Sequence, residues 1–366
     1  MNLHLRSRTS LPLALSAVPV VAALGLVAPG AAQAAASCTP DVGGTGLSAS
    51  VVAHDHQRIS RTTVDATGCD IGIYVGAGAD HVTIRGVRVT GAGYQGIFAE
   101  KVSHLRISDS TVTGNAYKTV DPSAPPLPGS GVRSFVGQAF AISLFGVSHV
   151  TVQGNKVYDN GRGGIGVMDN GPFDPGARME KQNPAAPLVK TSWVKVVDND
   201  TWGNYNGCGV VAATQNVDGA LSHITIRDNR ITGIGFGAAG PDIGGIVVAA
   251  DLPGSTVTRA DVAGNTVRDS FEGGLIVNSE APGSSTTGVY LYDNQVSGNN
   301  VGFLEAPNTA GVITFAAPGA ANNDTRIFRN TITDQFFGVW SRGDHPPTLS
   351  ANTIAVTAGG VPVSLG

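Results

Sequence analysis

The stretch HVTVQGNKVYDNGRGGIGVMD, residues 149–169, carries the pattern that decides the fold. Apolar and polar residues alternate on both sides of Asn155, as they do in short, half-buried β-strands. A glycine pair then opens a second apolar run that ends at Asp169. The stretch therefore predicts short strands separated by tight turns.

The same unit recurs along the chain. The clearest copies are HVTIRGVRVTGAGYQGIFAE at 81–100, WVKVVDNDTWGNYNGCGVVAA at 193–213, ADVAGNTVRDSFEGGLIVN at 260–278 and RIFRNTITDQFFGVW at 326–340. Their central asparagines align with others as Asn155, Asn199, Asn229, Asn265, Asn294, Asn330 and Asn352, and Ser110 and Val87 take this place in earlier units. The closest spacings are 22 or 23 residues, as from Asn330 to Asn352 and from Val87 to Ser110.

A repeat of this length with three short strands is one rung of a parallel β-helix. A single rung cannot bury its apolar face, so rungs stack and share a continuous core. We expect the asparagines at the turns to adopt left-handed backbone geometry and to hydrogen-bond from rung to rung. The asparagines are therefore assigned a structural role.

These units resemble the right-handed parallel β-helix proteins, which include pectate-lyase-like folds and NosD-like carbohydrate-binding and sugar-hydrolase repeats. The resemblance spans residues 49–363 and implies an all-β, single-domain right-handed solenoid of about nine rungs. It does not transfer an activity, since many functions occur on this scaffold. The chain lacks both the Asp-Pro-His motif of mannuronan epimerases and the paired-Asp strand motif of polygalacturonases.

Composition and the N-terminal residues agree with an exported all-β protein. The chain has 366 residues, 50 of them glycine, and only 14% are charged. Residues 1–34 read as a signal peptide, with Arg6 and Arg8 before an apolar run and a small-x-small site at its end. Residues 35–70 are predicted to form an N-terminal cap and first rung, and residues 71–366 the β-helix repeats. No later apolar run is long enough for a transmembrane segment.

Charge and cysteines narrow the partners and the location. Removing the signal leaves 21 basic residues (23 less Arg6 and Arg8) against 27 acidic ones, and this acidic balance disfavours nucleic acid. Export permits disulfides, and Cys38 is expected to pair with Cys69. Cys208 precedes an apolar run and is expected to be a buried free thiol.

Four insertions interrupt the repeat, at 116–138, 170–191, 233–243 and 298–310. The first, third and fourth fall at the same point of the unit, so we expect them to flank a groove on one side. Aromatic, amide and charged residues suited to a sugar lie on the predicted floor. The predicted substrate-binding residues are Tyr94, Asp159, Trp202, Asn204, Tyr205, Asn206 and Phe271.

The carboxylates of this floor are the candidate catalytic groups. Equivalent positions on neighbouring rungs lie about 4.8 Å apart, so carboxylates one or two rungs apart match retaining or inverting glycosidases. The best set is Asp269 and Glu272, with Glu305 one rung on or Asp242 one rung back. A lyase would instead need a base and a cation that neutralises a uronate carboxylate, and the candidates for that cation are Arg162, Arg268, Lys118 or a bound Ca²⁺.

Two further patterns have alternative interpretations. His54, Asp55 and His56 form either a polar cap strand, which we favour because no third ligand is evident, or part of a metal site. The histidines that begin successive units, His81, His104, His149 and His223, indicate a turn or surface role. Acidic residues after the apolar runs are expected to form a solvated stripe, or alternatively a Ca²⁺ site: Glu100, Asp169, Asp251, Glu280 and Asp344.

The leading functional hypothesis is a secreted polysaccharide lyase or glycoside hydrolase that acts in a groove along the β-helix. The alternative is a non-catalytic extracellular glycan-binding or surface-structural protein, because no catalytic motif is complete. A polysaccharide or oligosaccharide is the expected partner in both cases. No cofactor other than Ca²⁺ is indicated, and the sequence leaves the oligomeric state open.

Overall fold

The computed structural model describes residues 37–116, 140–205, 207–235, 244–299 and 310–366, without the side chain of Met179. Residues 35–366 form one compact unit, and residues 1–34 lie outside the described part of the chain. The unit is all-β: its described residues hold thirty strands and two short 3₁₀ segments, η1 (Val42–Gly44) and η2 (Met179–Lys181). In these residues, no helix has the length and apolar character needed to cross a membrane.

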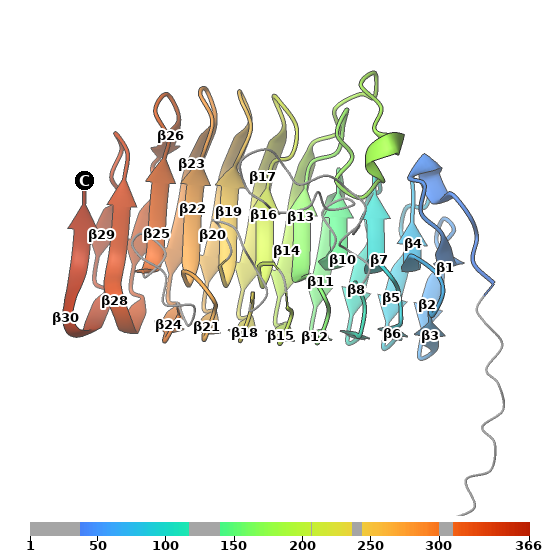
Figure 1. Cartoon of the computed structure of the whole chain (residues 1–366), viewed down its shortest axis with the longest axis horizontal. Helices are drawn as coiled ribbons and strands as arrows, with labels where there is room; N and C mark the ends of the chain where they lie inside the picture. The colour runs from blue at the N-terminus through green and yellow to red at the C-terminus, as the bar shows by residue number, and fades with distance from the viewer. Residues whose placement is uncertain (1–36, 117–139, 206, 236–243, 300–309) are drawn as a thin grey trace, which may run out of the picture. The chain divides into compact units, whose positions relative to one another are not determined.

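Three strands make each rung, and each rung's strands pair in parallel with those of the next (Figure 1). The first face contains β1 (Ala49–Val52), β4 (Ile71–Val75), β7 (Gln95–Glu100), β10 (Phe140–Phe145), β13 (Gly163–Met168), β16 (Val210–Ala213), β19 (Ile246–Ala250), β22 (Leu275–Ser279), β25 (Ala310–Ala316) and the second halves of β28 (Thr331–Arg342) and β30 (Thr353–Leu365).

The other two faces complete the rungs. The second face contains β2 (Arg58–Ser60), β5 (Thr83–Arg85), β8 (Arg106–Ser108), β11 (Ser148–Gln153), β14 (Thr191–Val197), β17 (Ala220–Arg227), β20 (Thr256–Ala263), β23 (Ser285–Tyr292), β26 (Ala321–Asn323), β27 (Arg326–Phe328) and β29 (Thr348–Ser350). The third face contains β3 (Thr63–Asp65), β6 (Arg88–Thr90), β9 (Thr111–Thr113), β12 (Lys156–Tyr158), β15 (Asp200–Trp202), β18 (Arg230–Thr232), β21 (Thr266–Arg268), β24 (Gln295–Ser297) and the first halves of β28 and β30.

The core fills the space between the three faces with columns of aliphatic side chains. One column on the second face runs Ile59, Ile84, Ile107, Val152, Val196, Ile226, Val262, Leu291 and Ile327, all buried. Each such side chain contributes about 2 kcal/mol by leaving water. The structure therefore confirms that the apolar residues of the alternating pattern point into the core and align from rung to rung.

The asparagine ladder is confirmed. Asn294 donates its backbone N–H to Asn330 Oδ1 at 3.0 Å, and Asn265 does the same to Asn294 Oδ1 at 3.0 Å. Ser110 holds the same position and accepts from the backbone N–H of Val87 at 3.1 Å. The predicted backbone geometry was wrong by one residue, because the left-handed φ belongs to the residue before the asparagine. These left-handed residues include Asp109, Gly154, Asp198, Asp228, Gly264, Asp293 and Arg329.

A column of small residues explains the glycine that opens each apolar run. Gly72, Gly96, Ala141, Gly164, Gly209, Gly245, Gly274, Gly311 and Gly338 take equivalent positions at the start of successive rungs of the first face. A Cβ at Gly245 would lie 2.8 Å from the carbonyl oxygen of Gly274 and would also overlap Val267. At Gly245 the corner between the third and first faces is therefore too tight for a side chain, while Ala141 shows that one rung of this column accommodates a methyl group.

The N-terminal end is closed by a disulfide and by the second insertion. Cys38 bonds to Cys69, and Cys208 is buried and outside any disulfide, as the sequence predicts. The 170–191 insertion reaches back to this end, where Arg178 donates its backbone N–H to Thr45 at 2.9 Å and its Nε to Gly46 at 2.8 Å. The other three insertions lie almost entirely outside the described residues, so the groove walls stay a prediction.

Candidate functional site

The predicted groove floor lies in the turns that join third-face strands to first-face strands. Asp269 has a φ of 56° there, and Asp159 and Asp334 take the same turn position with φ of 50° and 55°. Other rungs use glycine at this point, for example Gly203 and Gly233. Aspartate tolerates left-handed geometry better than most residues, so these aspartates have a structural reason to occupy the turn.

The two leading candidate catalytic carboxylates have different surroundings. Asp269 is exposed and lies 3.9 Å from Arg268 Nε, an exposed ion pair of little energetic weight. Glu272 is only 2% exposed, and Phe271 between them is half-buried. The two carboxyl groups therefore do not share one open surface, and their catalytic role stays a prediction.

The prediction that Asn204 binds substrate was wrong, because Asn204 has a structural role. It is fully buried in a second ladder, where its Oδ1 accepts from the backbone N–H of Asn160 at 3.2 Å. Its Nδ2 donates to the carbonyl of Val157 at 3.1 Å. Asn115 and Asn160 continue this ladder, which the sequence reading did not separate from the surrounding turn residues.

Tyr94 also does not form an open sugar platform. It is buried at the N-terminal end, and the Arg178 guanidinium lies over its ring at 5.5 Å from the centroid. Arg162 is half-buried, and burial lowers its pKa to about 10. Asn206, Asp242 and Glu305 lie outside the described residues.

Two residues of the predicted set, Trp202 and Arg268, lie in one outward row of the third face, with Thr232 between them. Tyr158 and Trp202 stack with ring centroids 4.2 Å apart and planes 5° apart. Arg268 continues the same outward row two rungs beyond Trp202, and Tyr205 is 59% exposed in the turn after Trp202. This row therefore gives the third face an outward surface of aromatic and cationic side chains.

A second surface, formed largely by the histidines for which the sequence indicates a turn or surface role, begins the strands of the second face. Seven residues in a column along the rungs have φ between 55° and 58°: His56, His81, His104, His149, Trp193, His223 and Arg259. All are exposed except His223, which is half-buried. From His56 to His223 the rings of adjacent rungs stack, with centroids 3.9 to 6.2 Å apart. We call this set the ring column.

The ring column borders a hollow of about 370 Å³, which we call the Trp193 pocket. Trp193, His223 and Arg259 line it from the column, and the outward side chains of the second face complete the lining: Lys195, Thr225, Asp261 and Tyr290. Gly288 takes the column position after Arg259 and has no side chain to fill the space. The hollow therefore stays open at the position of Gly288.

Hydrogen bonds fix the orientation of the pocket groups. Arg259 Nη1 lies 2.9 Å from His223 Nε2. Because a guanidinium only donates, Nε2 accepts and the proton of a neutral imidazole sits on Nδ1. Tyr290 Oη donates to Asp324 at 2.9 Å, and this hydrogen bond raises the pKa of Tyr290. Two cations and one carboxylate line the pocket, so its local charge is positive although the chain is acidic overall.

The predicted solvated acidic stripe was wrong for its first two members. Glu100 is 2% exposed and accepts from Tyr74 Oη at 2.6 Å and from Asn170 Nδ2 at 3.2 Å. Burial, followed by the nearby charge of Asp174, raises the pKa of Glu100 to about 7. Asp169 is also buried, and burial raises its pKa. The 170–191 insertion contributes Asn170 and Asp174, which a strand-by-strand reading could not place beside Glu100.

Comparison with known proteins identifies the fold family. The model described as "Right handed beta helix region" matches residues 49–239, which is 191 of the 366 residues and just over half of the chain. The chain belongs to this family. No curated protein matches this β-helix by sequence.

Solved structures resemble this β-helix at low sequence identity. The A-module of the Azotobacter vinelandii mannuronan C-5 epimerase AlgE4 is 20% identical with a TM-score of 0.55, and the match covers 84% of this chain and 71% of that one. The A-module of AlgE6 from the same organism gives 20% identity, a TM-score of 0.53, and coverage of 84% and 69%. PfbA, a surface adhesin of Streptococcus pneumoniae, is 11% identical with a TM-score of 0.49, and the match covers 88% of this chain and 86% of that one. At these identities the likeness shows the fold alone.

Proposed function

We propose that this β-helix is an exported glycan-binding protein that holds an acidic polysaccharide in the Trp193 pocket. The observation that carries the proposal is the meeting of aromatic rings and two cations around one hollow. This is the non-catalytic alternative of the sequence reading, placed on a different face from the predicted groove. The groove residues Asp269, Arg268, Trp202 and Tyr205 remain the candidate site for cleavage.

The aromatic part of the pocket suits the apolar face of a sugar ring. Trp193 is 50% exposed, although exposing an indole to water is unfavourable. Its stacking on His223 holds the ring in one orientation at no further entropic cost on binding. Because His149 and His223 stack on the two faces of this ring, a sugar would gain its contact area at the exposed edge of the indole, without a rearrangement of the protein.

The charged part of the pocket suits a carboxylate on that sugar. Lys195 lies on the same strand as Trp193, Arg259 lies one rung beyond His223, and both offer charge-assisted hydrogen bonds. Asp261 and Thr225 offer acceptors and a hydroxyl for sugar OH groups. A uronate therefore satisfies the pocket better than a neutral sugar. The names of the similar epimerase modules refer to mannuronan, which supports polyuronates as the first probes.

Export is part of the proposal. The Cys38–Cys69 disulfide suits an oxidising compartment, and residues 1–34 have the sequence of a signal peptide. Mass spectrometry of protein recovered from the medium of an expressing culture tests this inference. An N-terminus near residue 35 supports export, and intact protein retained in the cytosol contradicts it.

A panel of polysaccharides separates binding from cleavage. The protein is incubated with alginate and polygalacturonate, and with neutral cellulose and xylan as controls. We expect retention on the acidic polymers at least about tenfold above the neutral ones, with no new reducing ends and no ultraviolet absorbance from new double bonds. New reducing ends would indicate a hydrolase, and new double bonds would indicate a lyase. Equal retention on all four polymers would overturn the assignment of the pocket as a site for acidic glycans.

A charge variant links the selectivity to the pocket. Lys195→Gln removes a cation of the pocket, while Arg268→Gln removes a cation of the third face. We expect only Lys195→Gln to reduce the preference for acidic polymers. A loss confined to Arg268→Gln would place the binding surface on the third face.

A further inference from the structure

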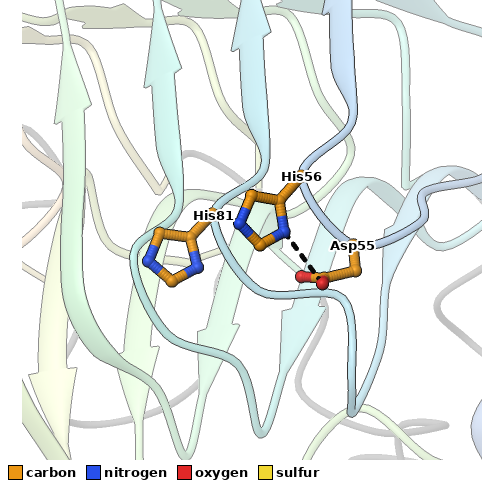
Figure 2. Close-up of side chains that lie close together, drawn as sticks. All are labelled: Asp55, His56 and His81. Carbon is orange, nitrogen blue, oxygen red and sulfur yellow. Dashed lines mark ion pairs between the residues drawn. The ribbon is translucent and has the colours of Figure 1, made fainter.

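Three potential metal ligands meet at the N-terminal end of the ring column (Figure 2). Asp55 and His56 lie in the connection between β1 and β2, and His81 lies in the equivalent connection of the next rung. One ligand atom from each residue lies within 4.8 Å of the others. Among the described residues, this is the one group of three or more His, Cys, Asp or Glu side chains with that geometry.

The backbone brings these residues together without help from a ligand. His56 and His81 have φ of 58° and 57°, so both side chains leave the strand in the same direction. Their rings stack with centroids 4.7 Å apart, about the spacing of two paired strands. His56 also donates its backbone N–H to the carbonyl of Asp80, next to His81, at 2.8 Å. The two imidazoles are therefore held one rung apart.

Asp55 adds the charge that distinguishes this end of the column. Its Oδ2 lies 2.8 Å from His56 Nδ1, as the dashed line in Figure 2 shows. An ion bound by both residues would replace this hydrogen bond, because the carboxylate oxygen and the imidazole nitrogen that share it would both turn to the ion.

We propose that Asp55, His56 and His81 bind a divalent transition metal ion of the zinc class and that the ion joins the first rung to the second. Imidazole nitrogen with one carboxylate is a donor set for zinc, whereas calcium and magnesium prefer oxygen ligands. Bond lengths of about 2.0–2.2 Å require the three side chains to close around the ion. All three side chains are exposed, and closing around an ion would move His81 out of its stack with His104.

The consequence is a brace at the end of the solenoid. The first rung has a neighbouring rung on one side only, because β2 pairs with β5 and begins the sheet of the second face. An ion shared between His56 and His81 would link these two rungs beyond their backbone hydrogen bonds. Because binding favours the folded state, the ion would raise the unfolding temperature.

Isothermal titration of the full chain with Zn²⁺ tests the site, with Ca²⁺ as a second titrant. His149 supplies a matched control, since it lies in the same column with a φ of 55° and stacks between two rings without an aspartate partner. We expect one Zn²⁺ site, weakened at least about tenfold by His81→Ala and by Asp55→Asn, unchanged by His149→Ala, and not filled by Ca²⁺. A rise in the unfolding temperature with Zn²⁺ should disappear in the same two variants.

Two outcomes would overturn the proposal. One is wild-type protein that binds no Zn²⁺, and the other is equal binding by wild type, His81→Ala and Asp55→Asn. Because all three replaced side chains are exposed, circular dichroism is expected to match the wild type and confirms that each variant folds. The result is independent of glycan binding, since none of the three ligands lines the Trp193 pocket.

Discussion

Trp193 stacks on His223 with ring centroids 3.9 Å apart and planes 14° apart. The two residues lie on adjacent rungs of the second face, each at a left-handed backbone position. The stack exists because the β-helix repeats the same kink once per rung and places successive side chains one strand spacing apart. A turn position required by the fold has thus become a continuous aromatic and imidazole surface beside a positively charged pocket.

Replacing a ladder asparagine should destabilise the protein strongly. Asn294→Ala removes the acceptor for the backbone N–H of Asn265 and leaves that buried donor unpaired. We expect the unfolding free energy to fall by about 3 kcal/mol. Gln295→Ala, at the exposed neighbouring position, is the control and should change it by less than about 0.5 kcal/mol. If urea unfolding shows the same loss of unfolding free energy in both variants, the ladder hydrogen bonds do not stabilise the protein more than an exposed side chain does.

The glycine column should tolerate no added side chain where the corner is tight. Gly245→Ala places a Cβ 2.8 Å from the carbonyl oxygen of Gly274, so we expect a loss of about 2–3 kcal/mol. Gly319→Ala has no atom closer than 3.6 Å but a φ of 81°. It should cost only about 1 kcal/mol of backbone strain. Thermal unfolding of both variants measures the difference, and a milder effect at Gly245 would contradict the packing argument.

Glu100 should make the protein less stable as the pH rises. Its pKa is about 7 in the folded chain, above its ordinary value of 4.5, so between these values the folded state holds a proton that the unfolded state has lost. The stabilisation is present below about pH 4.5 and is lost by about pH 7, a change of about 3 kcal/mol.

The Glu100→Gln variant tests this linkage. We expect it to flatten the fall in unfolding temperature between pH 5 and pH 8. Burial also raises the pKa of Asp169, which leaves a slope of the same sign. A variant with the wild-type slope would show that Glu100 does not retain a proton in the folded state.

The disulfide should hold the N-terminal end in place. Cys38 and Cys69 are 31 residues apart, and closing a loop of this length contributes about 3–4 kcal/mol in the chain-entropy account. Cys69→Ser should therefore lower the unfolding temperature. Reductant should lower it for the wild type alone, and an equal response of the variant to reductant would show that the effect comes from elsewhere.

Most of the fold could be predicted because each rung repeats the same constraints. Asn155 and its equivalents mark a turn in which one amide serves the next rung, and this requirement is visible in every unit from Asn155 onward. The disulfide followed from the position of two cysteines near one end. The second ladder of Asn115, Asn160 and Asn204 was missed because fewer rungs carry an asparagine there.

The site was harder to predict because it depends on side-chain directions and on insertions. Sequence spacing placed Asp269 and Glu272 three residues apart, but it could not show that one points to solvent and the other is buried. The regular histidines were visible, yet the pocket formed only where Trp193 and Arg259 replace histidine and Gly288 leaves a gap. His81 could be placed beside Asp55 only once the register of the rungs was known.

The most direct test of the account is the affinity of two tryptophan variants for a polyuronate oligosaccharide by isothermal titration calorimetry. Trp193→Ala removes the ring that lines the pocket, and Trp202→Ala removes the ring stacked on Tyr158 on the third face. We predict that Trp193→Ala lowers the affinity at least about tenfold and that Trp202→Ala leaves it within about twofold of the wild type. Loss of binding in Trp202→Ala with full binding in Trp193→Ala would contradict the account and place the glycan in the groove of the third face.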